Sequence, residues 1–213
     1  MQIALQQLVP IFFDHDQKTD SQIWRQQVTI QKGERLHLVA PSGSGKTSLV
    51  HFLYGMRNDY NGTILYDGQN IKQFDAEKFA IWRQQHLSIV FQDLRLFQEN
   101  TVEENILVKR DLCPFEAAAS PLEMLEKLGL GKKLKALCKH CSYGEQQRIA
   151  IIRSLQQPFD FILLDEPFSH LDEHNRHLAM ALIETEAKKR NAAIILADLK
   201  QIDYFNADRI LFL

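Results

Sequence analysis

The sequence has few cysteines, no long apolar run and no excess of basic residues, and each absence excludes a class of protein. Three cysteines among 213 residues do not form an even set for a disulfide framework and suit a reducing compartment. No stretch is long and apolar enough to cross a bilayer, and residues 1–10 lack the basic start and apolar core of a signal peptide. We therefore expect a cytoplasmic protein that contacts a membrane only through a partner.

The charge balance gives no reason to expect a nucleic-acid partner. The chain carries 25 basic and 27 acidic residues, for a formal net charge of -2, whereas nucleic-acid binders usually show a basic excess. At 45% hydrophobic residues, the composition permits a substantial buried core. We expect one domain over residues 1–213, with a subdomain set into it.

Strands and helices alternate along the chain, which predicts an α/β core with a parallel sheet. Short strands are expected before residue 33, and a glycine-bounded strand at residues 62–68 favours an antiparallel N-terminal β subdomain. Residues 94–157 differ, because their patterns favour helices and indicate a helical insertion. The predicted strands lie at 28–30, 35–40, 62–68, 86–91, 161–165, 193–197 and 209–213, and the predicted helices at 47–54, 103–108, 122–128, 145–156 and 173–190.

A glycine-rich turn between the strand at 35–40 and the following helix matches the P-loop pattern G-x-x-x-x-G-K-[ST], except that Ala40 replaces the first glycine. Gly43 and Gly45 let successive backbone N–H groups point inward, Lys46 adds a charge for the outer phosphates, and the Thr47 hydroxyl suits Mg²⁺. A turn that binds nothing is the alternative, but the lysine and hydroxyl have no packing purpose there. Ala40 is tolerated only if its φ is negative. The predicted nucleotide-binding residues of this loop are Pro41, Ser42, Gly43, Ser44, Gly45, Lys46, Thr47 and Ser48.

Two acids, Asp165 and Glu166, end the apolar strand FILLD. Ligands of open α/β sheets lie at the carboxyl ends of the strands. Asp165 is therefore predicted to hold Mg²⁺, and Glu166 to polarise the attacking water. A solvated strand end is the alternative, which the preceding phosphate loop makes weak.

A further segment, CSYGEQQR at residues 141–148, resembles the LSGGQ signature of the ATP-binding cassette (ABC) family and the helix after it. Gln92 resembles that family's Q-loop glutamine, SHLD at residues 169–172 its D-loop, and ADRI at 207–210 a run near its last core strand. The run FQDLRLFQENTVEEN at residues 91–105 is similar to cassettes of the lipoprotein-release, macrolide-export and cell-division group. The resemblance covers nearly the whole chain.

The resemblance implies a mechanism in which two cassettes, as a homodimer or a pair, sandwich two ATP molecules head to tail. Ser142, Gly144 and Glu145 of one chain would then meet the nucleotide bound to the other. Gln92 would join Thr47 and Asp165 as the Mg²⁺ set, with Lys46 and Glu166 as the catalytic pair. The implied cofactors are ATP and Mg²⁺. The implied partner is a membrane permease at the inner face of the membrane, which would feel dimer closure through a groove near residues 94–97.

The sequence departs from the family pattern at the switch histidine, which follows the last core strand in a run like VTHDL. Alignment of that run on Asp198-Leu199 places Ala197 where the histidine should stand. Loss of one group that stabilises the transition state typically costs on the order of a hundred- to a thousandfold in rate. We therefore expect slow ATP turnover unless a partner compensates.

Two other positions bear on nucleotide binding. Tyr143 replaces the first glycine of the signature and either obstructs the second nucleotide or packs outward. The aromatic that stacks on adenine in the family has its nearest counterparts in Phe12 and Phe13, of which Phe13 is our prediction; an ordinary core phenylalanine is the alternative for either.

Three functions therefore compete. The first is an ATPase subunit that moves a membrane partner. The second is a nucleotide-gated dimerisation module that hardly hydrolyses ATP, because Ala197 and the altered signature weaken the chemistry. The third is a soluble ABC protein of DNA repair or translation, which usually has two cassettes or a long coiled-coil insertion, and the chain shows neither.

Overall fold

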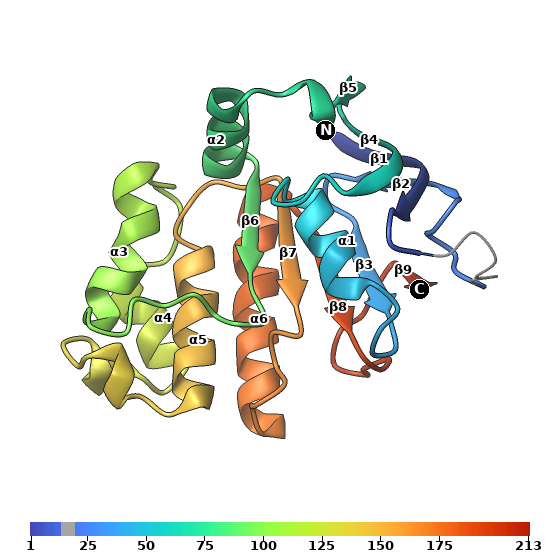
Figure 1. Ribbon diagram of the computed structural model, residues 1–213. Helices are drawn as coiled ribbons and strands as arrows, with labels where there is room; N and C mark the ends of the chain where they lie inside the picture. The colour runs from blue at the N-terminus through green and yellow to red at the C-terminus, as the bar shows by residue number, and fades with distance from the viewer. Residues whose placement is uncertain (14–19) are drawn as a thin grey trace.

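The computed structural model describes residues 1–13 and 20–213 and contains two sheets (Figure 1). The larger is a parallel sheet with the strand order β6-β7-β8-β3-β9. Its strands are β3 (Arg35–Val39), β6 (Leu87–Val90), β7 (Phe161–Asp165), β8 (Ala193–Asp198) and β9 (Arg209–Phe212). Because the strands run in one direction, the loops that follow β3, β7 and β8 meet at one edge, where the phosphate loop and the acid pair come together.

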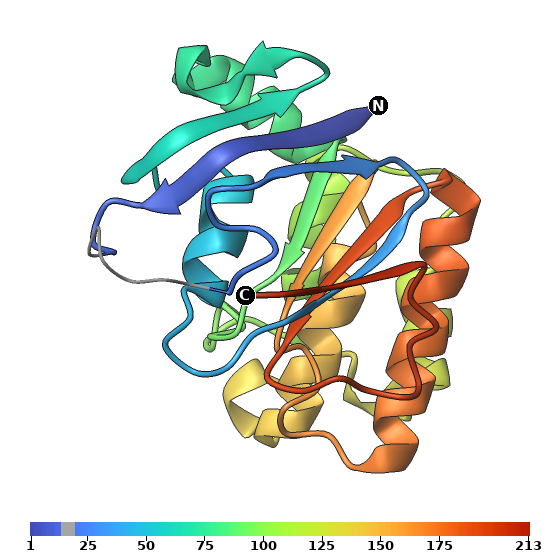
Figure 2. The ribbon, with the colours of Figure 1, turned by 90° about the vertical axis from the view of Figure 1, so that its right-hand side faces the viewer.

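The smaller sheet is antiparallel, with the order β2-β1-β4-β5. Its strands are β1 (Gln2–Pro10), β2 (Gln27–Gln31), β4 (Tyr60–Tyr66) and β5 (Gln69–Asn70). The pairing of β1 with β4 shifts its register between Gln6 and Val9, where Gly62 has a φ of 86° and leaves no room for a Cβ, since one would lie 2.3 Å from the Gln7 carbonyl oxygen. Figure 2 shows this sheet above the edge of the parallel sheet, with α1 beneath it.

Two hydrophobic cores lie on opposite faces of the parallel sheet, and alternate residues of β7 and β8 enter them. Phe161 and Leu163 of β7 pack with the antiparallel sheet and α1 (Lys46–Leu53), whereas Ile162 and Leu164 pack with the helices on the other face. Those helices are α3 (Val102–Leu112), α4 (Pro121–Lys127), α5 (Tyr143–Ser154) and α6 (Glu173–Arg190). Short 3-10 turns occupy Ile71–Gln73, Gly131–Lys133 and Cys138–His140.

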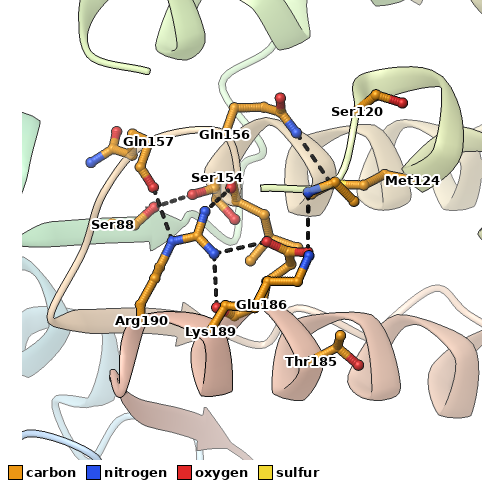
Figure 3. A network of polar contacts seen from close by, with 12 residues as sticks. Ser88, Ser120, Met124, Ser154, Gln156, Gln157, Thr185, Glu186, Lys189 and Arg190 are labelled. Carbon is orange, nitrogen blue, oxygen red and sulfur yellow. Dashed lines mark hydrogen bonds and ion pairs between the residues drawn. The ribbon is translucent and has the colours of Figure 1, made fainter. Parts of the chain in front are cut away.

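The helices α3, α4 and α5 fall within the predicted helical insertion at residues 94–157 and stand to one side of the parallel sheet (Figure 1). A buried ion pair on α6 joins them to the core (Figure 3). The Arg190 Nη1 lies 2.8 Å from the Glu186 Oε2, and its Nη2 donates to the Leu155 carbonyl at the end of α5. The second Glu186 oxygen accepts from the Ala119 amide, just before α4. Burial alone would raise the pKa of Glu186, but Arg190 and Lys189 outweigh it and lower that pKa.

The predicted fold class is confirmed: an α/β protein with a parallel sheet, a separate antiparallel sheet and a helical insertion. The predicted ranges of β7 and α6 match the structure, and the other predicted elements overlap observed ones. The sequence reasoning missed α2 (Ala76–Gln85), which buries none of its residues fully and so carries little periodic signal.

Candidate nucleotide site

The phosphate loop connects β3 to α1, and most of its residues line one pocket. Gly43 and Gly45 have φ angles of 83° and 88°, which side-chain-bearing residues rarely adopt. Gly45 is the N-cap of α1 and makes no side-chain cap bond, so the first amides of the helix stay available for an anion. Ala40 is fully buried and is not among the positive-φ residues of the described chain, so its replacement of glycine costs no backbone strain.

The floor of the loop is aromatic, which sequence reasoning did not anticipate. The indole N–H of Trp24, a buried residue, donates to the Ser44 carbonyl at 3.0 Å. A Cβ at Gly45 would lie 3.1 Å from the Trp24 ring and 3.2 Å from the Phe13 ring. Trp24 lies in an irregular segment before β2, where a lone tryptophan gives no periodic signal. These two rings support the loop from behind and make glycine the fitting residue at position 45.

The acid pair lies at the end of β7, beside the loop. Asp165 is 1% exposed, and neither carboxylate oxygen has a hydrogen-bond partner in residues 1–13 and 20–213. Burial raises the pKa of Asp165 to about 6, against the opposing effects of Thr47 and Lys46. Glu166 forms a buried ion pair with Lys46 and has a φ of 46°. A non-glycine residue held in this region marks strain of the kind that gathers at functional sites.

The residues predicted to hold magnesium fit that ion. The Thr47 Oγ1 lies 3.5 Å from the Gln92 Oε1, and both residues border one cavity with Asp165. A buried carboxylate without a partner is costly unless it pairs with a cation or protonates. Carboxylate, amide and hydroxyl oxygens are the ligands that magnesium prefers. The structure thus brings Thr47, Gln92 and Asp165 together as the sequence predicted.

A pocket of about 340 Å³ lies over the loop, and Phe12 rather than Phe13 contributes to its wall. Phe12 is 54% exposed, whereas Phe13 packs edge-on against Trp24 with ring centroids 5.8 Å apart. The other lining residues are Pro41, Ser42, Gly43, Gly45, Lys46, Thr47, Ser48, Gln92, Glu166 and Leu199. Among the predicted loop residues, Ser44 turns its hydroxyl inward, where it is buried without a hydrogen-bond partner within the described chain.

The signature residues lie at the start of α5 and are bonded within their own chain. Ser142 is the N-cap, its hydroxyl accepts from the Glu145 amide, and the Glu145 carboxylate accepts from the Ser142 amide, which together form a capping box. Glu145 also pairs with Lys133 at 3.3 Å. A Cβ on Gly144 would lie 3.0 Å from the His170 carbonyl oxygen. None of these three residues lines the pocket over the phosphate loop in the part of the chain that is described.

The end of β8 separates two candidates for the switch position. The side chain of Ala197 is buried in the core with Leu38, and the Ala197 carbonyl accepts a hydrogen bond from the Glu166 amide. Asp198, one residue on, is half-buried and interacts electrostatically with Lys46 and Glu166. Burial raises the pKa of Asp198. The side chain of residue 198, not that of 197, therefore lies in the field of Lys46 and Glu166.

Comparison with known proteins agrees with this geometry. Residues 25–169 match the family described as ABC transporter. The chain belongs to the ABC transporter ATP-binding family. The lipoprotein-releasing system ATP-binding protein LolD of Shewanella denitrificans is 31% identical over 186 residues, which are 85% of this chain and 80% of that protein. The macrolide export ATP-binding/permease protein MacB of Shewanella sp. (strain W3-18-1) is 32% identical over 188 residues, 86% of this chain and 29% of that protein. The predicted resemblance to this group of ABC proteins is confirmed.

The fold also matches that of solved ABC cassettes. A dimeric ABC transporter cassette, MJ0796, superposes with a TM-score of 0.83 at 22% identity and covers 99% of this chain and 94% of its own. A structure of the same cassette bound to ADP and Pi is described as a post-hydrolysis state. ABC cassettes bind and hydrolyse ATP, so this chain is an ABC ATP-binding subunit and an ATPase. No helix in its described residues is both long and apolar enough to span a membrane.

Proposed function

We propose that two copies of the chain, or the chain and a paired cassette, close head to tail around two ATP molecules and thereby move a membrane partner. The observation that carries this proposal is that Lys46, Thr47 and Glu166 border the pocket over the phosphate loop, while Thr47 also borders the cavity that Asp165 lines. The dimeric form of the MJ0796 cassette supports the pairing of two chains. The LolD and MacB relatives support a membrane complex.

The chain's own residues suggest how triphosphate would enter. Lys46 is 6% exposed and paired with Glu166, so an arriving γ-phosphate competes with that carboxylate for the ammonium. Transfer of Lys46 to the phosphate frees Glu166 to take the proton of the attacking water. Thr47, Gln92 and Asp165 would hold Mg²⁺, which would neutralise charge on the phosphate oxygens. Phe12, which borders the pocket, is the better placed aromatic for the adenine; the prediction for Phe13 becomes a supporting role behind the loop.

The partner would dock on the groove between the core and the helical insertion. A cavity of about 340 Å³ lies between α2 and α3, bordered by Ala80 and Gln84 on one side and Lys109 and Leu112 on the other. Leu112 is 62% exposed there. The predicted segment at residues 94–97 does not border this cavity; in it Leu94 is buried and Phe97 is 53% exposed. We propose that the exposed side chains of Phe97, before α3, and Leu112, at its end, meet the partner at the inner face of the membrane.

The hydrolysis-weak module remains a second candidate, because an aspartate lies in the field of the catalytic pair and a tyrosine stands in the signature. Glu166→Gln separates the two functions. For the ATPase, phosphate release should fall roughly a hundredfold or more, the usual worth of a general base. Nucleotide affinity measured by calorimetry should hold or rise, because the competitor for Lys46 loses its charge.

Two further results complete this test. Lys46→Ala should abolish the binding heat of Mg-ATP, since it removes a buried cation that borders the pocket. Equal and negligible turnover of wild type and Glu166→Gln, with nucleotide-dependent dimerisation intact, would favour the second candidate. No binding heat in the wild type would contradict both.

A further inference from the structure

The side chain of Tyr143 joins three separate segments of its own chain. It projects from the first turn of α5, and its hydroxyl donates to the Gln92 carbonyl, 3.2 Å away in the loop after β6. Its ring packs edge-on against His170 in the loop after β7, with centroids 4.3 Å apart. The side chain is 45% exposed, so solvent reaches it, but both of its ends are held. Tyr143 therefore neither points outward nor stands free.

The position of Tyr143 is fixed by its neighbours on α5. Gln147, one turn further on, is buried; its Nε2 donates to the Ser169 hydroxyl at 3.0 Å, and its Oε1 accepts from the His170 amide at 3.1 Å. Gly144 approaches the His170 carbonyl so closely that a Cβ there would lie 3.0 Å from the oxygen. The start of α5 is thus pressed against the loop after β7, which directs the side chain of Tyr143 towards Gln92.

The cavity beside Tyr143 is the magnesium side of the nucleotide site. A space of about 410 Å³ is bordered by Tyr143 together with Thr47, His51, Gln92, Asp93 and Asp165. The Gln92 side-chain oxygen lies 3.5 Å from the Thr47 hydroxyl, while the backbone carbonyl of the same residue is held by Tyr143. Gln92 therefore accepts a hydrogen bond from Tyr143 with its backbone carbonyl, while its side chain faces the proposed metal position.

We propose that Tyr143 is a positioning residue for magnesium: its hydroxyl holds the backbone of Gln92 so that the amide oxygen stays beside Thr47 and Asp165. This inference rests on the proposed function of those three residues. A glycine at position 143 offers neither hydroxyl nor ring, so the tyrosine adds a link within the chain between the signature helix and the metal side of the same chain's site. The loop after β6 contains two consecutive residues of positive φ, Leu94 and Arg95. Such a strained backbone keeps its conformation only when contacts from other segments hold it, and the Tyr143 hydroxyl supplies one such contact.

The test uses the full chain and Tyr143→Phe, which removes the hydroxyl and keeps the ring against His170. We measure the Mg²⁺ concentration that gives half-maximal binding of a fluorescent ATP analogue, and that for half-maximal ATP turnover. One neutral hydrogen bond corresponds to a rise of roughly two- to tenfold in both concentrations. Tyr143→Gly, which also removes the ring contact, should raise them further. Affinity for the analogue in EDTA should not change, because the tyrosine acts through Gln92 and not on the phosphates.

Tyr66→Phe is the matched control, since it removes a buried tyrosine hydroxyl that has no partner in the described chain and lies in β4 of the antiparallel sheet. Its Mg²⁺ requirement should equal that of the wild type. An unchanged or lower Mg²⁺ requirement in Tyr143→Phe would overturn the inference while leaving the nucleotide site intact. Binding by the wild type that does not depend on Mg²⁺ at all would instead overturn the proposed metal residues, and this inference with them.

Discussion

The phosphate-loop side and the signature side of the molecule differ in how far their polar groups are hydrogen-bonded within the chain. On the first side, the Ser44 hydroxyl and both Asp165 oxygens are buried without partners in the described chain, and Gly45 leaves the start of α1 uncapped. On the second side, Ser142 and Glu145 cap each other at the start of α5. Buried polar groups are normally hydrogen-bonded, so a cluster of unpartnered ones marks a place prepared for a ligand.

The same comparison shows where the chain has diverged. The phosphate loop keeps every fixed position of the motif except the first, and the residue there, Ala40, has an ordinary backbone. The signature has changed at Cys141, Tyr143 and Glu145, and the last two now make contacts within the chain. The unpartnered groups of the first side therefore need an external ligand, whereas Ser142 and Glu145 of the second side already bond to each other. The buried Nε of Arg148, further along α5, is an exception on the second side, since it has no partner in the described chain. The following predictions test that difference, from the largest effect to the smallest.

Asp165 should make the ligand-free protein less stable as the pH rises. Its pKa in the folded chain is raised to about 6 from 3.8, so the folded state binds a proton more tightly than the unfolded state does. Stability is then highest below about pH 4 for this group and falls as the pH rises to about 6, by about 2–3 kcal/mol in total. Asp165→Asn should remove this component and raise the free energy of unfolding at pH 7, as measured by urea denaturation.

One outcome would contradict this prediction for Asp165. Wild type and Asp165→Asn with the same pH dependence of stability between pH 4 and pH 7 would mean that the carboxylate is satisfied in solution. Function requires the opposite of stability at this residue. Asp165→Asn should therefore lose Mg²⁺-dependent nucleotide binding while it gains stability. A gain of stability on loss of a ligand group is the mark of a site built for binding rather than for folding.

The end of β8 provides the next test. The carboxylate of Asp198 lies in the field of Lys46 and Glu166 and would repel the γ-phosphate. Asp198→His should therefore raise steady-state phosphate release on the order of a hundredfold, the lower end of what one group that stabilises the transition state contributes. Asp198→Asn, which removes the charge without adding an imidazole, should give part of that increase.

Ala197→His is the comparison that tests the sequence alignment. Ala197 is fully buried in the core, so a histidine there should lower the thermal unfolding midpoint, because it overfills a packed space and buries a polar ring. A stable Ala197→His protein with faster turnover would favour residue 197 as the switch position. Slower turnover in Asp198→His would contradict a repulsive role for the aspartate.

The sequence predicted best where physical constraints are local. The phosphate loop needs glycines, a lysine and a hydroxyl in a fixed order, and β7 is a run of apolar residues that ends in two acids; both were predicted with their neighbours. The sequence carried no signal for relations that run through a distant contact. Trp24 donates to the Ser44 carbonyl from another segment of the chain. Asp198 rather than Ala197 lies beside Lys46 because side chains alternate along β8. Phe12 rather than Phe13 borders the pocket because of the direction of the loop after β1. None of these relations has a fixed spacing in the sequence.

Two serine-to-alanine changes make the smallest and most direct comparison of the two sides. Ser142→Ala removes the N-cap of α5 and half of its capping box, so it should cost about 1 kcal/mol of unfolding free energy. Ser44→Ala removes a buried hydroxyl without a partner in the described residues, so it should leave the stability of the ligand-free protein unchanged or slightly higher. Calorimetry should show Mg-ATP binding close to that of the wild type for both variants, because neither Ser44 nor Ser142 borders the pocket over the phosphate loop. If Ser44→Ala proves the less stable variant, the hydroxyl serves folding, and unpartnered groups on this side of the molecule would no longer mark the nucleotide site.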